Sequence, residues 1–151
     1  MTNEGTILLV EDNSDDVFFM RRAFKAAEIS NPLQVVSDGS QAIQYFRGLG
    51  KFADREAHPL PVLVLLDLKM PIRDGHEVLE WMRLRKQFRT SVVIVLTTSQ
   101  EMSDVKRAYR LGANSYLVKP SSPPELVEQV RAIKRYWLDQ NLFTQSVAAL
   151  I

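Results

Sequence analysis

The sequence predicts an α/β fold in which parallel strands alternate with amphipathic helices. Its apolar residues come in short unbroken runs, such as 62–66 and 92–96, which are typical of strands buried on both faces. Between these runs, apolar residues recur at helical spacing, and turn-forming residues such as Asn31, Pro32 and Gly112 separate the segments. Strands that alternate with helices in this way form a parallel sheet with helices on both sides.

Five strand–helix units account for most of the chain. The expected strands are residues 7–10, 33–36, 62–66, 92–96 and 115–118. The helices that follow are marked by apolar residues at helical spacing, namely Val17, Met20, Phe24 and Ala27, then Ala42, Ile43, Phe46 and Leu49, then Val78, Leu79 and Met82, then Val105, Ala108 and Tyr109, and finally Leu126, Val130, Ile133 and Trp137. Because crossovers between parallel strands are right-handed, few topologies remain, and we expect the doubly wound, flavodoxin-like strand order 2-1-3-4-5.

Length and composition bound the domain and its surroundings. The 151 residues fit one domain, residues 1–151, with a core of about 6–138 and a C-terminal tail at 139–151. The net charge of +1 offers no strong field, so we expect neither nucleic acid nor a membrane as a partner. The chain has no cysteine for disulfide or thiolate chemistry, and its first residues lack a secretory pattern. No apolar run approaches the roughly 18 residues of a membrane span, so the expected location is the cytoplasm.

Polar residues follow several of the expected strands at the point where each strand ends. Glu11 and Asp12 follow the first strand, Asp67 the third, Thr97 the fourth and Lys119 the fifth. The carboxyl ends of parallel strands meet at one edge of the sheet, where ligands bind in folds of this kind. At about 4 Å and an effective dielectric near 20, each pair of like charges costs on the order of 4 kcal/mol, so these carboxylates need a cation. Oxygen ligands without Cys or His point to a hard ion such as Mg²⁺.

This group of residues is suited to phosphoryl transfer. Asp67 can attack a phosphoryl group while the metal, Lys119 and Thr97 neutralise the oxygens of the transition state, and the product is a phospho-aspartate. Each residue alone also has a structural interpretation: Glu11 and Asp12 could cap a helix, Asp67 could cap a turn, Thr97 could be a strand-end hydroxyl and Lys119 a solvated lysine. Because all five occupy matching strand ends, we favour the functional interpretation.

The same residues resemble the receiver domain of two-component response regulators. The resemblance rests on Glu11-Asp12, on Asp67 with Met70-Pro71 and Asp74-Gly75, on Thr97, and on Tyr116 before Lys119-Pro120. It covers about residues 6–138 and implies that Asp67 takes a phosphoryl group from a histidine kinase or a histidine phosphotransfer protein. It also implies that Lys119 pairs with the phosphoryl group and that the Lys119–Pro120 peptide is cis. The implied ligands of Mg²⁺ or Mn²⁺ are Glu11, Asp12, Asp67 and the main-chain carbonyl of Lys69.

The family also implies a conformational switch on phosphorylation and residues that set the lifetime of the phosphoryl group. Thr97 would move towards the phosphoryl oxygen, and Tyr116 would swing into the space it leaves; the alternative for Tyr116 is a half-buried strand aromatic. The switch would remodel the face formed by the fourth helix, fifth strand and fifth helix, which contacts a downstream protein. Two positions that tune phosphoryl lifetime in the family hold Lys69 and Thr98, and we expect both to hinder attacking water and lengthen the lifetime. His58 and His76 lie off the strand ends, and we interpret both as solvated.

Receivers often drive an attached effector, but here a short tail follows the last helix. We therefore expect a stand-alone receiver that signals through protein contacts and is not an enzyme in the usual sense. The long connection at 48–61, expected at the surface, and residues 136–138 resemble the single-domain regulators that serve phytochrome-type kinases. A homodimer could form through the face described above or through the tail.

Two alternatives belong to other functional classes. A haloacid-dehalogenase-type phosphatase also uses a strand-end aspartate and Mg²⁺, but that family needs a second aspartate two residues later, where this chain has Lys69. A receiver-like interaction module that never takes phosphate is the other alternative, and the complete acid cluster with Thr97 and Lys119 argues against it.

Overall fold

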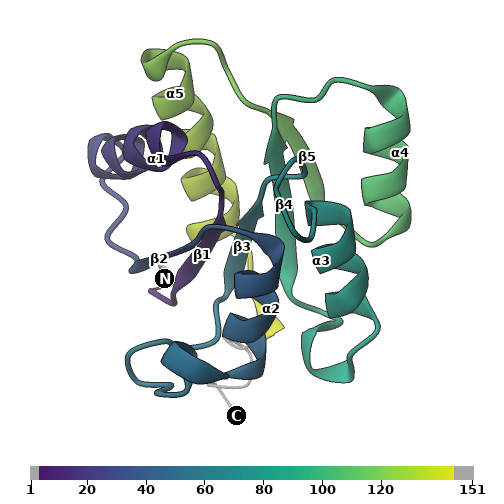
Figure 1. The fold of residues 1–151 in the computed structure, drawn as a ribbon. Coiled ribbons are helices and arrows are strands. Elements are labelled where there is room, and N and C mark those ends of the chain that lie inside the picture. Colours follow the sequence, from purple (N-terminus) through teal and green to yellow (C-terminus); the bar gives the residue numbers. More distant parts are fainter. Residues whose placement is uncertain (1–3, 145–151) are drawn as a thin grey trace.

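Five parallel strands form the central layer of the molecule (Figure 1). The computed structural model describes residues 4–144. Its strands are β1 (Ile7–Val10), β2 (Leu33–Val36), β3 (Leu63–Leu66), β4 (Val92–Thr97) and β5 (Ser115–Val118). They pair in the order β2-β1-β3-β4-β5, and each neighbouring pair is parallel. The flavodoxin-like topology expected from the sequence is therefore confirmed.

Helices cover both faces of this sheet (Figure 1). The α-helices are α1 (Ser14–Ala26), α2 (Gly39–Arg47), α3 (Gly75–Arg83), α4 (Met102–Arg110) and α5 (Pro123–Ile133). Three short helical segments are η1 (Gly50–Phe52) and η2 (Lys86–Phe88), which are 3₁₀ helices, and η3 (Lys134–Leu138), a π-helical turn that continues α5. Helices α1 and α5 pack on one face, and α2, α3 and α4 pack on the other.

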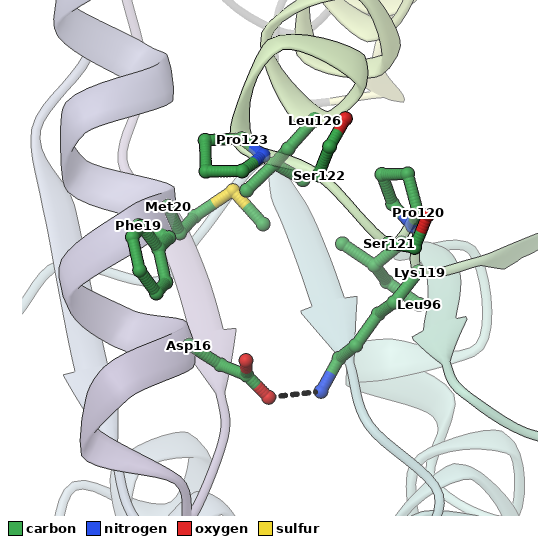
Figure 2. Close-up of a pocket in the computed structure, with 10 residues that line it drawn as sticks. All are labelled: Asp16, Phe19, Met20, Leu96, Lys119, Pro120, Ser121, Ser122, Pro123 and Leu126. Atoms are coloured by element: carbon green, nitrogen blue, oxygen red, sulfur yellow. Dashed lines mark hydrogen bonds and ion pairs between the residues drawn. The ribbon is translucent and has the colours of Figure 1, made fainter.

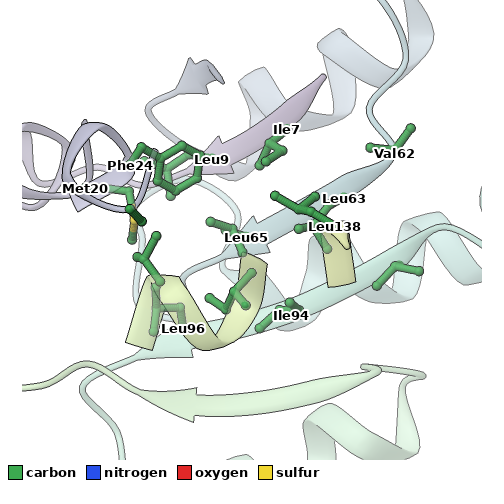
Figure 3. Close-up of a cluster of buried hydrophobic side chains, with 14 of the residues drawn as sticks. Ile7, Leu9, Met20, Phe24, Val62, Leu63, Leu65, Ile94, Leu96 and Leu138 are labelled. Atoms are coloured by element: carbon green, nitrogen blue, oxygen red, sulfur yellow. The ribbon is translucent and has the colours of Figure 1, made fainter. Parts of the chain in front are cut away.

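Alternate residues of the central strand face opposite layers. In β3, Leu63 and Leu65 belong to the apolar cluster beneath α1 and α5 (Figure 3), whereas Val64 and Leu66 belong to the cluster beneath α2 and α3. All four are fully buried, as the unbroken apolar run predicts. A strand that is apolar on both sides can carry a polar group only where it ends, which is where Asp67 lies.

Polar caps place the beginnings of the helices beside the strand ends. The first-turn N–H groups of α1, α2, α3 and α5 donate to the side chains of Asn13, Asp38, Asp74 and Ser122 respectively. Such caps satisfy N–H groups that have no partner within the helix. Since each helix begins where a strand has just ended, the helix N-termini surround the carboxyl edge of the sheet.

Gly75 allows α3 to begin directly against the main chain that carries Asp67. A Cβ atom at this position would lie 2.3 Å from the main-chain carbonyl oxygen of Asp67. The N–H of Gly75 donates to the carbonyl of Leu68 at 3.0 Å. The glycine is required by this close approach, and its φ angle is not left-handed.

The connection between α2 and β3 is more ordered than the sequence suggests. Phe52 in η1 is buried, and Arg55 donates to the main-chain carbonyls of Tyr45, Phe46 and His58 at 2.7, 2.7 and 3.2 Å. The His58 ring packs edge-on against Tyr45 and Phe52, so the expectation of a solvated His58 is wrong. Charged residues made this segment look like a plain surface loop, but its arginine supplies hydrogen bonds that hold it to α2.

His76 is also buried rather than solvated, with an exposed fraction of 3%. Its Nε2 atom lies 3.4 Å from the main-chain carbonyl oxygen of Asp104 in α4. The ring is enclosed because α3 and α4 pack side by side, a tertiary contact that local sequence does not report. The expectation of a solvated His76 is therefore wrong.

The first residues of the expected tail return to the core. Phe143 is 2% exposed and belongs to the cluster beneath α1 and α5. The apolar end of the tail, residues 145–151, which we considered for a dimer interface, lies outside the described residues. Over residues 4–144, none of the helices combines the length and apolar character needed to span a membrane.

Candidate functional site

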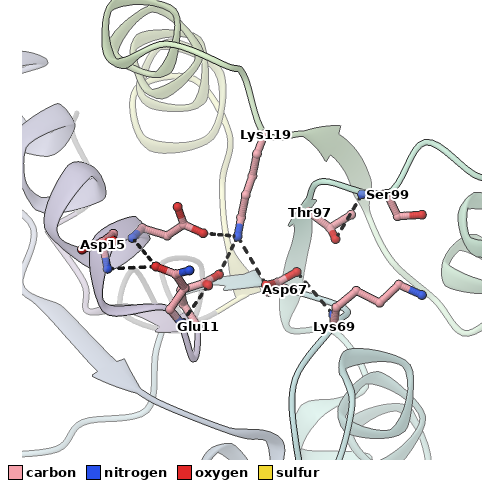
Figure 4. Close-up of polar contacts among 9 residues, drawn as sticks. Glu11, Asp15, Asp67, Lys69, Thr97, Ser99 and Lys119 are labelled. Carbon is pink, nitrogen blue, oxygen red and sulfur yellow. Dashed lines mark hydrogen bonds and ion pairs between the residues drawn. The ribbon is translucent and has the colours of Figure 1, made fainter.

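The polar residues predicted from the strand ends lie together at the carboxyl edge of the sheet (Figure 4). Their main chains extend the sheet hydrogen bonds by one step: Glu11 N–H donates to Val36, Asp67 N–H to Val10, and Lys119 N–H to Thr97, at 3.0, 3.1 and 2.8 Å. The main chain that carries these side chains therefore continues the hydrogen bonding of the sheet.

Three carboxylates converge at this edge. One oxygen from each of Glu11, Asp12 and Asp67 lies within 4.8 Å of the other two. Glu11 and Asp67 are buried, at 3% and 7% exposure, whereas Asp12 faces solvent. Burial, with the charge of Asp67 added, raises the pKa of the Glu11 carboxyl to about 7. An all-oxygen cluster with one side open to water fits a hydrated divalent ion such as Mg²⁺.

Lys119 places its ammonium group among carboxylates (Figure 4). Its Nζ atom lies 2.8 Å from Glu11, 2.9 Å from Asp16 and 3.3 Å from Asp67. Burial alone would lower the pKa of this ammonium, but hydrogen bonds to Glu11 and Asp16 and the charge of Asp67 together raise it above its ordinary value. Lys119 therefore remains protonated and neutralises part of the acidic cluster.

Asp16 does not appear among the residues that the strand ends predict. It lies in the first turn of α1, and its N–H donates to the capping Asn13 side chain at 3.1 Å. The position of Asp16 could have been predicted from the sequence. A helix that begins immediately after a strand has its first turn at the same edge of the sheet. A carboxylate in that turn is within reach of Lys119.

A second group of polar contacts lies on the α4 side of the site. Thr97 is fully buried, and its Oγ1 accepts from the N–H of Ser99 at 3.5 Å. The Tyr116 hydroxyl donates to the Ser99 carbonyl at 3.0 Å, and the Ser99 hydroxyl donates to Asp104 at 2.6 Å. Lys69 Nζ lies 3.3 Å from the same Asp104 carboxylate. The Ser99 hydroxyl, followed by Lys69, lowers the pKa of Asp104, so this carboxylate stays ionised.

These contacts connect the predicted phosphoacceptor to α4. The N–H of Lys69 donates to Asp67 Oδ1 at 3.4 Å, while its side chain pairs with Asp104 near the start of that helix. The Lys69 side chain is 62% exposed and Thr98 is exposed as well, so both are open to solvent. Ser99 and Asp104 were not predicted, because neither follows a strand directly.

The expected cis peptide is not present. Among the residues that the structure describes, every peptide bond is trans, including Lys119–Pro120. This part of the sequence prediction is therefore wrong. The trans isomer is favoured intrinsically even before proline, and Lys119 reaches all its carboxylate partners from it.

A cavity of about 270 Å³ adjoins the site between α1 and the segment after β5 (Figure 2). Phe19, Met20 and Leu126 give it apolar walls, and Asp16 and Lys119 meet at one end of it. The Asp16–Lys119 pair is therefore accessible from this cavity.

Fold and site together define a doubly wound α/β domain with an acidic, metal-fitting edge. The family model of the response regulator receiver domain matches residues 7–131. The chain belongs to this family, whose members are signalling proteins rather than classical enzymes. The family membership sets aside the phosphatase alternative.

The chain is similar over most of its length to two individual regulatory proteins. The probable methanogenesis regulatory protein FilR2 of Methanothrix harundinacea is 41% identical over 135 residues, which cover 89% of this chain and 84% of FilR2. Response regulator Rcp1 of Synechocystis sp. is 35% identical over 133 residues, which cover 88% of each chain. The crystal structure of the Mn²⁺-bound form of Rcp1 has a TM-score of 0.83, with 34% identity over 92% of this chain and 98% of that one.

A third relative is known in a phosphorylated form. The crystal structure of the phosphorylated cyanobacterial phytochrome response regulator RcpA has a TM-score of 0.87 and 31% sequence identity. The alignment covers 94% of this chain and 99% of that chain. The similarity therefore extends over whole chains and includes regulators that serve phytochromes.

Proposed function

We propose that this chain is a phosphorylatable response regulator that accepts one phosphoryl group on Asp67. The observation that carries the proposal is the convergence of the Glu11, Asp12 and Asp67 carboxylates within 4.8 Å, with Lys119 reaching Asp67 at 3.3 Å. A structural role alone would not require three acids and one cation at the same buried edge, since each uncompensated charge there is costly.

The proposed donor is a phosphohistidine on a histidine kinase or a phosphotransfer protein. A carboxylate oxygen of Asp67 attacks phosphorus, the phosphorus–nitrogen bond breaks, and the imidazole nitrogen keeps the electron pair and takes up a proton. Lys119 donates to the phosphoryl oxygens, and the Thr97 hydroxyl donates to them from the opposite side. Mg²⁺ or Mn²⁺, held by the three carboxylates and the Lys69 carbonyl, would supply positive charge to the same oxygens.

The proposed output is a change in protein contacts. Movement of the Thr97 hydroxyl towards the phosphoryl group would lengthen the contact that it accepts from the Ser99 N–H, and the Ser99 carbonyl accepts from Tyr116. Tyr116 could then turn inward and alter the surface of α4, β5 and α5, where a downstream protein or a second copy binds. Lys69 and Thr98, at the rim, are proposed to shield the phosphoryl group from water.

We further propose that residues 1–151 act as one stand-alone receiver in the cytoplasm. The near-complete coverage of FilR2 and Rcp1 supports a single-domain regulator. The likeness to the phytochrome response regulator RcpA makes a phytochrome-type kinase the first donor to test.

The direct test is mass spectrometry of the intact protein after incubation with acetyl phosphate and Mg²⁺. Wild type is expected to gain a single phosphoryl group, and EDTA is expected to prevent the gain. Asp67→Asn should remain unmodified, whereas Asp54→Asn, a matched change in the loop after η1, should behave like wild type. Equal modification of wild type and Asp67→Asn would refute the assignment of the acceptor, and turnover of a phosphate monoester would instead indicate a phosphatase.

A further inference from the structure

Asp16 is the carboxylate at this edge to which the proposed chemistry assigns no task. Its side chain lies 2.9 Å from Lys119 Nζ, yet it is not one of the three carboxylates that converge on the metal-fitting cluster. Its side chain is 41% exposed, compared with 3% for Glu11 and 8% for Asp67. Asp16 therefore touches the site from outside the cluster.

The donors of Lys119 are fully used in this arrangement. An ammonium group has three N–H bonds, and three carboxylates, from Glu11, Asp16 and Asp67, lie within 3.3 Å of it. The two shorter contacts, at 2.8 and 2.9 Å, are to Glu11 and Asp16, which both follow β1. Lys119 is thus held towards α1, and its contact with Asp67 is the longest of the three.

A phosphoryl group on Asp67 must share Lys119 with these acceptors. Glu11 and Asp67 both belong to the cluster that fits a divalent ion, so a bound cation would neutralise much of their charge. Asp16 lies outside that cluster and would keep its full charge beside Lys119. It is also the acceptor that water can rehydrate most easily when the contact breaks, because it is the most exposed of the three.

We propose that Asp16 is a positioning residue that competes with the phosphoryl group for Lys119. It holds the ammonium group towards α1 in the resting protein and releases it when Asp67 is phosphorylated. This inference rests on the proposed function of Asp67. Its consequence is that Asp16 weakens the phosphorylated state, so removing its charge strengthens the binding of a phosphoryl group.

The chain provides a matched control in the neighbouring residue Asp15. Both acids lie in the first turn of α1, and the N–H of each donates to Asn13. Within residues 4–144, however, the carboxylate partners of Lys119 are Glu11, Asp16 and Asp67, and Asp15 is not among them. Asp15→Asn and Asp16→Asn therefore remove the same charge from the same turn, and only the second removes the charge of a Lys119 partner.

The first measurement is the affinity for beryllofluoride, a phosphoryl analogue, at saturating Mg²⁺. Asp16→Asn is expected to bind it about two- to fivefold more tightly than wild type, the range set by a partly exposed ion pair. Asp15→Asn should stay within about 1.5-fold of wild type, because salt screens a charge without direct contact. Asp16→Ala, which leaves no oxygen to accept from Lys119, should show at least the same gain as Asp16→Asn.

The second measurement needs neither metal nor phosphoryl analogue. In EDTA, the Lys119 amine is labelled with an acylating reagent, and the extent is read by peptide mapping. Asp16→Asn is expected to raise the labelling of Lys119 about twofold or more, because one of its three charged partners is lost, whereas Asp15→Asn should not.

The outcomes separate the two proposals. If Asp15→Asn and Asp16→Asn behave alike in both measurements, the effect is one of general charge and the role of Asp16 is refuted. Tighter beryllofluoride binding by Asp15→Asn alone would refute it equally. If wild type fails both to bind beryllofluoride and to be phosphorylated, the function proposed for Asp67 is wrong, and the inference falls with it.

Discussion

Two partly buried cations, Lys119 after β5 and Arg83 at the end of α3, have opposite kinds of partner. Lys119 contacts three carboxylates, as described above. Arg83 donates to the main-chain carbonyl of Gly112 from Nε and Nη2, at 3.1 and 2.8 Å, and to that of Phe88 from Nη1 at 2.9 Å. The pKa shifts differ accordingly: burial lowers the pKa of Arg83, while the pKa of Lys119 is raised.

The two sets of partners indicate different roles: Arg83 has a structural role, whereas the contacts of Lys119 can be exchanged. The main-chain carbonyls of Gly112 and Phe88 are fixed by the backbone, so the bonds of Arg83 hold α3 to the turn before β5. Carboxylates can turn to a metal ion or to water, so the bonds of Lys119 can be replaced one at a time. A partly buried cation bound by acids is therefore the stronger indication of a functional site in this molecule.

Replacement of Lys119 by Met is expected to have the largest effect. The rate of phosphorylation by acetyl phosphate should fall by about 100-fold or more, because a preorganised donor to the phosphoryl oxygens is lost. Mg²⁺ should bind more tightly at the same time, since a positive charge leaves its site. Mass spectrometry over time and calorimetric Mg²⁺ titration measure the two effects. A rate close to that of wild type would contradict the role of Lys119.

Replacement of Arg83 by Met should act on stability instead. Its replacement removes the side-chain donors to these partly buried carbonyls, of which Phe88 keeps the N–H of Ser91, and the free energy of unfolding should fall by about 1–3 kcal/mol. Urea denaturation measures this change, while phosphorylation of the folded variant should stay within about twofold of wild type. Arg85→Met is the control, because Arg85 is exposed over the Trp81 ring and its loss should cost about 1 kcal/mol or less. If Arg83→Met and Arg85→Met lose the same free energy of unfolding, the structural role of Arg83 is refuted.

The raised pKa of Glu11 predicts that pH and Mg²⁺ act together. Without metal, folded Glu11 binds a proton more readily than unfolded Glu11 between pH 4.5 and about 7. Its contribution to stability therefore falls as the pH rises through that window and is constant above it. Bound Mg²⁺ favours the ionised form, so the rise in melting temperature on adding Mg²⁺ should be larger at pH 8 than at pH 5.5. Glu11→Gln should flatten this dependence, and a rise that is independent of pH in wild type would contradict it.

The smallest expected effect concerns the loop between Asp67 and α3. Ile72 has a φ angle of 68° and a side chain that is 77% exposed. A β-branched residue is strained in this left-handed region, where glycine is not. Ile72→Gly should therefore raise the free energy of unfolding by about 0.5–1 kcal/mol in urea denaturation. Ile72→Ala keeps a Cβ atom and should give no comparable gain; if it does, the effect lies in the lost apolar surface.

The sequence predicted the parts of the molecule that depend on local pattern or on topology. Unbroken apolar runs identified β3 and β4, and the rule that strand ends share an edge brought Glu11, Asp67 and Lys119 together. Contacts of polar side chains with distant main chain leave no such pattern. The bonds of Arg83 to Gly112, like the burial of His76 against α4, depend on how helices pack and were not predictable from spacing.

The resemblance to the receiver family predicted features that the sequence pattern alone does not indicate. It named Lys69 and Tyr116, whose positions near the site no periodicity would single out. It also suggested a cis bond before Pro120 that this structure does not have. Asp16 belongs neither to a strand end nor to the family motif, and its contact with Lys119 is what places it at the site.

The close approach of Gly75 to the Asp67 carbonyl limits how a local event can spread. With no room for even one carbon atom between them, the first turn of α3 and the end of β3 form a single mechanical unit. We therefore expect any displacement of Asp67, the proposed acceptor, to be directed away from α3 and towards α4, where an exposed ion pair joins Lys69 and Asp104. The α3 side of Asp67 is rigid and the α4 side can rearrange, so we expect structural changes at Asp67 to spread mainly towards α4.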